Sequence, residues 1–362
     1  MRFLEGTDPK ALDATLNSIP SGATEILYPL RGYIQREVSN IQYLRRLSSS
    51  LPQEGRAIAL LHETLRDRES LSEERLIKAI GLFGNPRALD LVRKSMNAGN
   101  AATRAAALEA LETLGDREIT QEVLPILDSG GIFQAPNDQP MSVAEAIESL
   151  FSDEDYWLRA LAARSVADLG LNEFVPWLRK LTSDSIPFVK QAAEDALVRM
   201  DGDAGMKTLK TLSTLERVLL LREVPMFSAI PPEDLEQIAE IAQEQLYSTH
   251  TLICREGERG STLFIIVTGK VEVIKGMGKT ENVIAVREPG EFVGEMAILE
   301  SAPRFATLRA QDDVRVLVIE GEAFKTILTD RPEVAISVLR HMSTRVRQLN
   351  QQVALPLPGR NS

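Results

Sequence analysis

Apolar residues recur at helical spacing through the first two hundred residues, and the pattern repeats itself. The best copies contain a helix of small and branched apolar residues that ends at a glycine, followed by an amphipathic segment with a proline inside it. One helix pair cannot bury its own apolar face, so self-similarity at about 30 residues predicts stacked helix pairs. The predicted helices are residues 76–84, 87–96, 104–115, 119–127, 159–170, 174–181 and 188–200.

The segments beside and between these repeats have their own signals. Residues 1–50 indicate helices broken at Pro20 and Pro29, and the serines and proline of residues 48–52 indicate a linker. Residues 130–140 are a surface loop by composition. Residues 208–221 predict a helical connector that joins the repeats to the last third of the chain.

In the last third, the pattern changes to short strands separated by turn glycines. The predicted strands are residues 245–248, 252–255, 263–267, 271–275, 283–287, 306–310 and 314–319. Two helices follow, over residues 322–328 and 332–352. The predicted fold class is therefore multidomain α + β, with an N-terminal all-α solenoid and a C-terminal jelly-roll-like β-roll with flanking helices.

Length and composition limit the function. The 362 residues predict two or three domains, and the net charge of −11 argues against general attraction to nucleic acid or anionic membrane. A single cysteine, Cys254, and three scattered histidines argue against a disulfide framework or a metal site. No apolar run approaches about 18 residues. We expect a chain in the cytoplasm, or at the cytoplasmic face of a membrane into which it does not insert.

Residues 294–307 contain two chemically opposed side chains on one short segment. Gly294 and Glu295 open an apolar piece of about one helical turn. Glycine there allows close approach of a ligand to the backbone, and the start of a helix favours an anion. Glu295 is an acceptor suited to ribose hydroxyls, while Arg304, after Pro303, offers a fork for two phosphate oxygens. Together they describe a site for a ribose with a cyclic phosphate.

This stretch resembles the phosphate-binding cassette of the cyclic-nucleotide-binding domain family. Residues 224–235 also resemble the segment with which that domain begins. The resemblance implies that Glu295 binds the ribose 2′-hydroxyl, and that Arg304 binds the cyclic phosphate together with backbone N–H groups near Gly294 and Ala306. The expected ligand-binding residues are Gly294, Glu295, Met296, Ala297, Pro303, Arg304, Phe305, Ala306 and Thr307. The expected ligand is cyclic AMP or cyclic GMP, without any other cofactor.

Phe305 departs from the family pattern, which usually has a small residue at this position. A hydroxyl there often helps to recognise guanine, so its absence favours cyclic AMP over cyclic GMP. A bulky ring would alternatively narrow the pocket.

In the family, the last helix folds over the base as a lid. The resemblance makes Met342, Thr344 and Arg345 candidates for capping the base. The alternative is that the arginines of this helix form a solvated face.

The helical part resembles HEAT-type repeats, which bind proteins. HEAT-like repeats before a nucleotide-binding domain are also similar to the soluble tails of bacterial transporters related to nucleotide translocases. The predicted domains are an N-terminal helical segment (1–50), HEAT-like repeats (51–206), a connector (207–223), the nucleotide-binding domain (224–352) and a tail (353–362).

Three hypotheses follow. The first is a sensor in which ligand binding changes how the repeats engage a protein partner, as in the regulatory tail of a transporter. The second is a structural scaffold whose nucleotide-binding fold is vestigial and empty. The third, an enzyme acting on nucleotides, lacks any nucleophile-and-base constellation, so we predict no catalytic residues. The sequence leaves the oligomeric state open.

Overall fold

The computed structural model describes residues 27–81, 109, 117–128, 141–201, 211–228, 230–276 and 281–354. The helices predicted at 87–96 and 104–115 and the loop at 130–140 lie outside the described residues, apart from residue 109, which is helical. The chain divides into two compact units, Met1–Asp153 and Glu154–Ser362. The division falls inside the range predicted for the repeats, and the domain boundaries stay a prediction.

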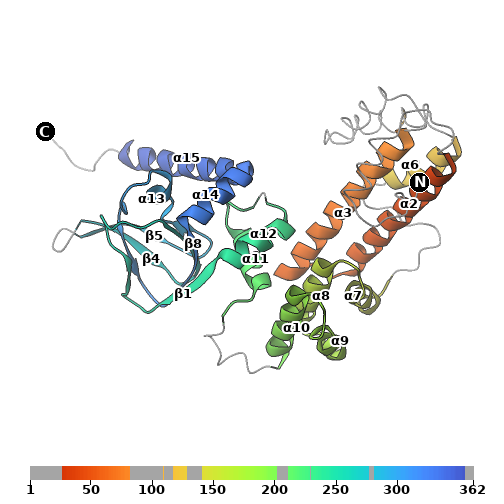
Figure 1. Cartoon of the computed structure of the whole chain (residues 1–362), viewed down its shortest axis with the longest axis horizontal. Coiled ribbons are helices and arrows are strands. Elements are labelled where there is room, and N and C mark those ends of the chain that lie inside the picture. The colour runs from red at the N-terminus through yellow and green to blue at the C-terminus, as the bar shows by residue number, and fades with distance from the viewer. Residues whose placement is uncertain are drawn as a thin grey trace. The chain divides into compact units, whose positions relative to one another are not determined.

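The first unit is helical (Figure 1), with α2 at Leu27–Ser50, α3 at Arg56–Gly81, α6 at Arg117–Asp128 and α7 at Val143–Phe151. Helices α2 and α3 pack against each other through buried residues that include Ile34, Ile41 and Leu61. Arg45 of α2 pairs with Glu73 of α3 at 2.9 Å.

Two sequence predictions in this unit were wrong. Pro29 does not break a helix, because it lies in the first turn of α2, where a backbone N–H would have no helical partner. The segment predicted to start at residue 76 is the end of α3, which runs unbroken from Arg56.

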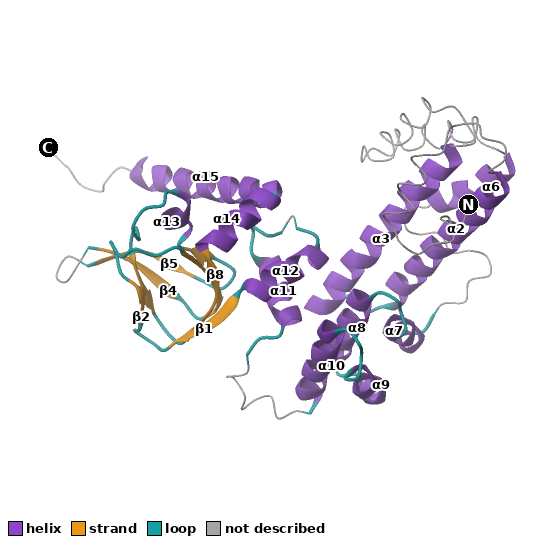
Figure 2. Ribbon diagram, in the orientation of Figure 1, coloured by secondary structure: helices purple, strands orange, loops and turns teal. Residues whose placement is uncertain are grey.

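The second unit begins with helices that match the repeat prediction (Figure 2, purple). They are α8 at Tyr156–Leu169, η3 at Asn172–Phe174, α9 at Val175–Leu181 and α10 at Pro187–Met200. Two further helices follow: α11 at Thr214–Glu223, which overlaps the predicted connector, and α12 at Pro232–Ile241, which lies in the predicted nucleotide-binding domain. Gly170 follows α8 with φ +66°, as predicted for a glycine stop. Trp157 of α8 stacks on Phe188 of α10 at 5.3 Å between ring centroids, which fixes the pair.

Two four-stranded antiparallel sheets form the rest of this unit. The first has the order β1-β8-β3-β6, with β1 at Gln243–Tyr247, β8 at Val314–Glu320, β3 at Thr262–Thr268 and β6 at Phe292–Val293. The second has the order β2-β7-β4-β5, with β2 at Leu252–Cys254, β7 at Thr307–Ala310, β4 at Val271–Lys275 and β5 at Asn282–Arg287. The predicted β-roll is confirmed, and β4 and β5 pair as neighbouring antiparallel strands.

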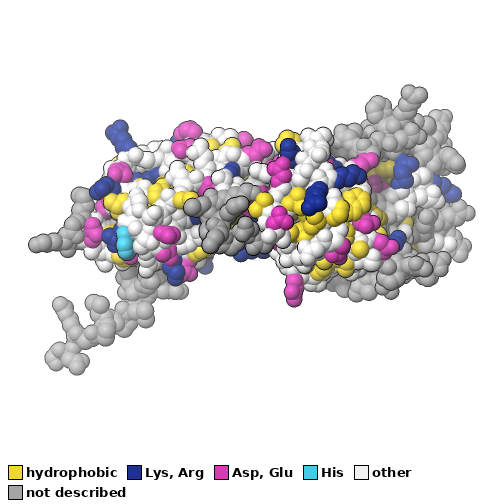
Figure 3. Space-filling model, turned by 90° about the horizontal axis from the view of Figure 1, so that it is seen from below, with side chains coloured by type: hydrophobic (Ala, Val, Ile, Leu, Met, Phe, Trp, Pro, Cys, Tyr) yellow, Lys and Arg dark blue, Asp and Glu magenta, His cyan; other side chains and the backbone are white. Residues whose placement is uncertain are grey.

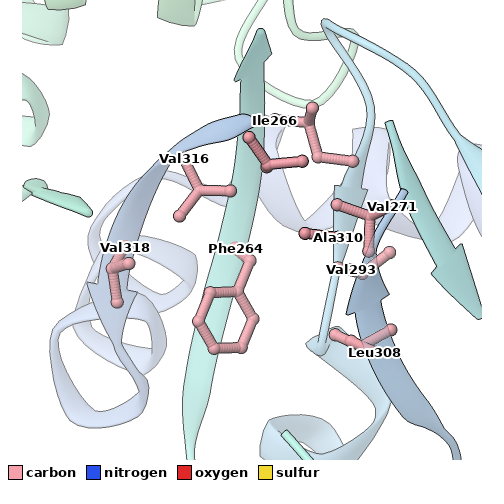
Figure 4. Close-up of a cluster of buried hydrophobic side chains, with 9 residues drawn as sticks. Phe264, Ile266, Val271, Val293, Leu308, Ala310, Val316 and Val318 are labelled. Atoms are coloured by element: carbon pink, nitrogen blue, oxygen red, sulfur yellow. The ribbon is translucent and has the colours of Figure 1, made fainter. Parts of the chain in front are cut away.

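Alternate residues of the strands build the core between the sheets (Figure 4). Phe264, Ile266, Val316 and Val318 come from the first sheet. Val271, Leu308 and Ala310 of the second sheet pack against them. This core holds the sheets face to face and sets the position of the segment between β6 and β7.

Three helices flank the sheets: α13 at Glu295–Leu299, α14 at Gly321–Asp330 and α15 at Pro332–Ala354. The last two agree with the predicted helices within a few residues at their ends. Among the described residues, no helix combines the length and apolar content needed to cross a bilayer. On the face seen in Figure 3, acidic and basic side chains are interspersed rather than gathered by sign.

Candidate functional site

The turn from β6 into α13 depends on Gly294, which has φ +100°. A Cβ at this position would lie 2.5 Å from the Thr262 carbonyl oxygen and 2.8 Å from Nη1 of Arg304. Both distances are too short for any side chain. Glycine therefore allows the start of α13 to pass directly against β3 and the guanidinium.

Arg304 is held in place by neighbouring backbone and by neutral oxygens. Its Nη1 donates to the Thr262 carbonyl at 2.8 Å, and its Nη2 donates to the Thr262 hydroxyl. Its own N–H donates to the Glu258 carbonyl at 2.8 Å, and its carbonyl accepts from Gly257 N–H at 2.9 Å. The side chain is buried, with 5% exposed. No carboxylate pairs with it among the described residues, so these contacts orient the positive charge without neutralising it.

Glu295, the first residue of α13, is buried with 3% exposed. It adjoins Gly294 and therefore lies beside the same turn as the guanidinium of Arg304. A buried carboxylate can accept several hydrogen bonds, and hydroxyl groups of a ligand are suitable donors.

Glu295 and Arg304 line one cavity of about 400 Å³. Pockets for small molecules typically span about 300–1,000 Å³, with mostly apolar walls and a few polar groups. The apolar walls here come from β4, β5, β7 and α15. They are Val273, Ile284, Ala285, Leu308, Met342 and Val346. The cavity thus offers a cation and an anion in an otherwise apolar setting.

Most of the predicted ligand-binding residues contribute to this cavity. The lining includes Gly294, Glu295, Met296, Ala297, Arg304, Phe305 and Ala306. Pro303 lies instead on a neighbouring depression on the other side of Ala297. The Thr307 hydroxyl accepts from the backbone N–H of Glu256 at 2.9 Å, so it supports the adjoining turn.

Phe305 forms part of the cavity wall and remains 51% exposed. Lys275 holds it from outside: Nζ lies 4.0 Å from the ring centroid and donates to the Phe305 carbonyl at 2.6 Å. Lys275 also pairs with Glu256 at 2.9 Å. The ring is therefore fixed at the rim and does not fill the cavity.

Of the three predicted base-capping residues, Met342 lines the cavity. Thr344 is exposed, and its hydroxyl donates to the Arg340 carbonyl at 3.0 Å. The Arg345 side chain is outside the described part of the chain. Val346, which was not predicted, also lines the cavity, one helical turn after Met342. Its i, i+4 spacing from Met342 is the sequence signal that could have identified it.

Sequence reasoning did not find the cavity residues on β2, β4 and β5, among them Cys254, Val273 and Arg287. Burial raises the pKa of the Cys254 thiol, so this thiol is less reactive than an exposed one. Ala285 and Arg287 are two positions apart on β5, so alternation places both on one face of the strand.

Comparison with known families agrees with this geometry. Residues 244–331, which include Glu295 and Arg304, match the family described as Cyclic nucleotide-binding domain. Residues 57–135 and 143–224 match the family of HEAT repeats. The chain therefore carries HEAT repeats followed by a cyclic nucleotide-binding domain, as predicted. The second HEAT match extends through α11.

Individual relatives share the nucleotide-binding part. The chain is 26% identical over 146 residues to a CRP-like cAMP-activated global transcriptional regulator of Mycobacterium tuberculosis, which covers 39% of this chain and 65% of the relative. It is 32% identical over 108 residues to a cAMP-dependent protein kinase regulatory subunit of Colletotrichum orbiculare, covering 30% of this chain and 27% of the relative. The Catabolite Activator Protein of Thermus thermophilus is 27% identical, with 36% of this chain and 62% of that structure covered and a TM-score of 0.34.

In each case the chain spans less than two thirds of the relative. These relatives are regulatory or binding proteins by name. The predicted similarity to transporter tails is not shown by these matches.

Proposed function

We propose that this chain is a cyclic-nucleotide sensor that binds cyclic AMP in its C-terminal domain and transmits the bound state to the HEAT repeats. The observation that carries the proposal is the burial of Glu295 and Arg304 on one cavity of about 400 Å³. We propose residues 224–352 as the binding domain and residues 51–206 as the surface for a protein partner. The resemblance to transporter tails stays a prediction from the sequence.

Each end of the ligand has a partner in this proposal. Arg304 donates to the cyclic phosphate, because it lines the cavity and has no carboxylate partner among the described residues. Glu295 accepts from the ribose 2′-hydroxyl. The purine then lies against the apolar wall, and Met342 and Val346 connect it to α15. Cyclic AMP is the proposed ligand because Phe305 has no hydroxyl for guanine and because one relative is named as cAMP-activated and another as the regulatory subunit of a cAMP-dependent kinase.

Polar contacts join the last repeat helices to one another and to α12, which lies in the proposed binding domain. Glu216 of α11 accepts from Arg164 of α8 at 3.4 Å and from Arg199 of α10. Tyr156 of α8 donates to Glu236 of α12 at 2.8 Å. Burial, together with this hydrogen bond, raises the pKa of Tyr156. We propose these contacts as the route by which ligand binding reaches α8 and α10.

Calorimetric titration of the full chain with cyclic AMP and cyclic GMP tests the sensor function directly. We expect saturable binding heat, with cyclic AMP binding more tightly. Adenosine 5′-monophosphate is the control, since it has the same base and ribose but a singly esterified phosphate. Absence of heat from both cyclic nucleotides at high micromolar concentration would favour the scaffold with an empty fold.

Hydrogen–deuterium exchange tests the coupling. In the native chain, we expect cyclic AMP to change amide exchange in α8 and α10. The double variant Tyr156→Phe/Glu216→Gln should lose that change and still bind cyclic AMP, because neither residue lines the cavity. Lys190→Gln is the control, since it breaks only an exposed pair with Glu194 on α10. A double variant that keeps the full exchange response contradicts this route.

A further inference from the structure

Lys275, the last residue of β4, contacts the cassette from outside and does not line the cavity. Its ammonium donates to the carbonyl of Phe305 at 2.6 Å. That carbonyl belongs to the peptide group that joins Phe305 to Ala306, near which the sequence predicts a backbone N–H for the cyclic phosphate. Neither the cassette pattern nor the family match assigns Lys275 a role.

The contact with Lys275 sets the direction of the Ala306 N–H. The peptide group between Phe305 and Ala306 is trans, so its carbonyl and its N–H point in opposite directions. The carbonyl faces Lys275, and the N–H therefore faces the side on which Ala306 forms the cavity wall. Ala306 is buried, and its N–H donates no hydrogen bond within the described part of the chain. Buried N–H groups are rarely left without an acceptor, and an anion in the cavity would supply one.

Lys275 is itself held where it can keep this contact. Its ammonium pairs with Oε1 of Glu256 at 2.9 Å and lies 4.0 Å from the ring centroid of Phe305. The other carboxylate oxygen of Glu256 accepts from the backbone N–H of Gly276 at 2.9 Å, which anchors the acid to the residue after Lys275. These contacts restrict the lysine before any ligand binds, so binding does not have to order it.

We propose that Lys275 is a positioning residue for phosphate binding, which holds the Phe305–Ala306 peptide group so that the Ala306 N–H donates to the cyclic phosphate. The inference rests on the proposed function of this cavity. A charge hydrogen-bonded to the carbonyl also polarises the peptide group, which makes its N–H a stronger donor. A side chain that does not contact the nucleotide therefore controls the affinity for its phosphate.

Calorimetric titration with cyclic AMP compares the native chain with Lys275→Met and Lys275→Arg. Methionine keeps an unbranched stem but cannot donate to the carbonyl, so we expect a loss of about tenfold in affinity. Arginine can donate to the same carbonyl, so its affinity should stay within about threefold of the native value.

Lys270→Met is the matched control, because it removes a similar ammonium that does not contact the cassette. Lys270 is 48% exposed, against 41% for Lys275, and it pairs with Glu288 at 2.6 Å. It does not line the cavity. We expect this variant to bind cyclic AMP as the native chain does.

Nuclear magnetic resonance separates positioning from a general loss of charge or stability. Phe305–Ala306 is the only Phe–Ala pair in the sequence. A chain labelled with ¹³C at phenylalanine carbonyls and ¹⁵N at alanine amides therefore gives one correlated amide signal, that of Ala306. A hydrogen bond to phosphate moves an amide proton downfield. At saturating cyclic AMP we expect this movement in the native chain, Lys275→Arg and Lys270→Met, and a much smaller one in Lys275→Met.

A Lys275→Met variant that keeps the native affinity overturns the inference. So does one that binds more weakly yet shows the full downfield movement at saturation, since the lysine would then act through its charge alone. If the native chain binds cyclic AMP without moving the Ala306 signal, the sensor function stands and the inference fails. If the native chain binds no cyclic nucleotide, the proposed function itself fails and the inference falls with it.

Discussion

Replacing Arg304 by alanine is expected to lower the affinity for cyclic AMP by about a hundredfold or more. The side chain is buried, and its charge is the proposed partner of the cyclic phosphate. Removing one partner of a buried charge pair costs about 3–5 kcal/mol, and each 1.4 kcal/mol is about tenfold in affinity. Calorimetric titration of the purified full-length variant measures the loss.

A control must separate binding from folding, because the same guanidinium donates to the Thr262 carbonyl and hydroxyl. Arg304→Lys keeps a positive charge, and we expect it to bind with intermediate affinity because an ammonium cannot form the bidentate contact. Thermal melting of each variant shows whether the fold persists. A folded alanine variant that binds cyclic AMP as tightly as the native chain would exclude the sensor and leave the scaffold.

The binding cassette was predictable because its chemistry is local. Glu295 and Arg304 lie nine residues apart and carry opposite charges, and Gly294 precedes them where a strand gives way to a helix. These features are enough to indicate a binding site. The structure places both side chains on one cavity. The hydrogen bond that the Thr307 hydroxyl accepts was not predictable, because its donor, the backbone N–H of Glu256, is 51 residues away in the sequence.

The opposite wall of the cavity was not predictable for the same physical reason. Val273 and Leu308 come together through the β4–β7 pairing, and Arg287 through the β4–β5 pairing. Strand patterns show which residues share a face, but the pairing register decides which faces meet. Strand positions were easier, since β4 was predicted with its observed bounds Val271–Lys275.

Helix positions were predicted best where a sequence signal is unambiguous. Gly170 marked the end of α8 correctly because its φ of +66° suits glycine. Pro29 misled the prediction because proline is unfavourable only beyond the first turn. The prediction that a helix starts at residue 76 was wrong because the sequence has no glycine or proline just before that position to show whether one helix continues or a new one begins. The structure has a single helix, α3, across it.

Replacing Gly294 by alanine is expected to destabilise the nucleotide-binding domain and to weaken ligand binding together. The added Cβ would meet the Thr262 carbonyl oxygen at 2.5 Å and Nη1 of Arg304 at 2.8 Å. The carbonyl belongs to β3 and cannot move without disturbing the sheet, so the guanidinium or the α13 turn must shift. Backbone strain at φ +100° and overpacking together cost about 2–5 kcal/mol. Thermal melting and cyclic AMP titration measure the two effects.

Gly290→Ala separates the clash from the strain. Gly290 has φ +85°, yet a Cβ there would meet nothing within 4 Å. This variant should therefore lose only about 1–2 kcal/mol of stability from the left-handed backbone, and it should bind cyclic AMP normally. The difference between the two variants isolates the contact at Thr262 and Arg304. A Gly294→Ala variant that melts at the same temperature as Gly290→Ala and binds cyclic AMP as the native chain does would show that the close approach at Gly294 does not position Arg304. Its orientation would then come from its hydrogen bonds with Thr262, Gly257 and Glu258.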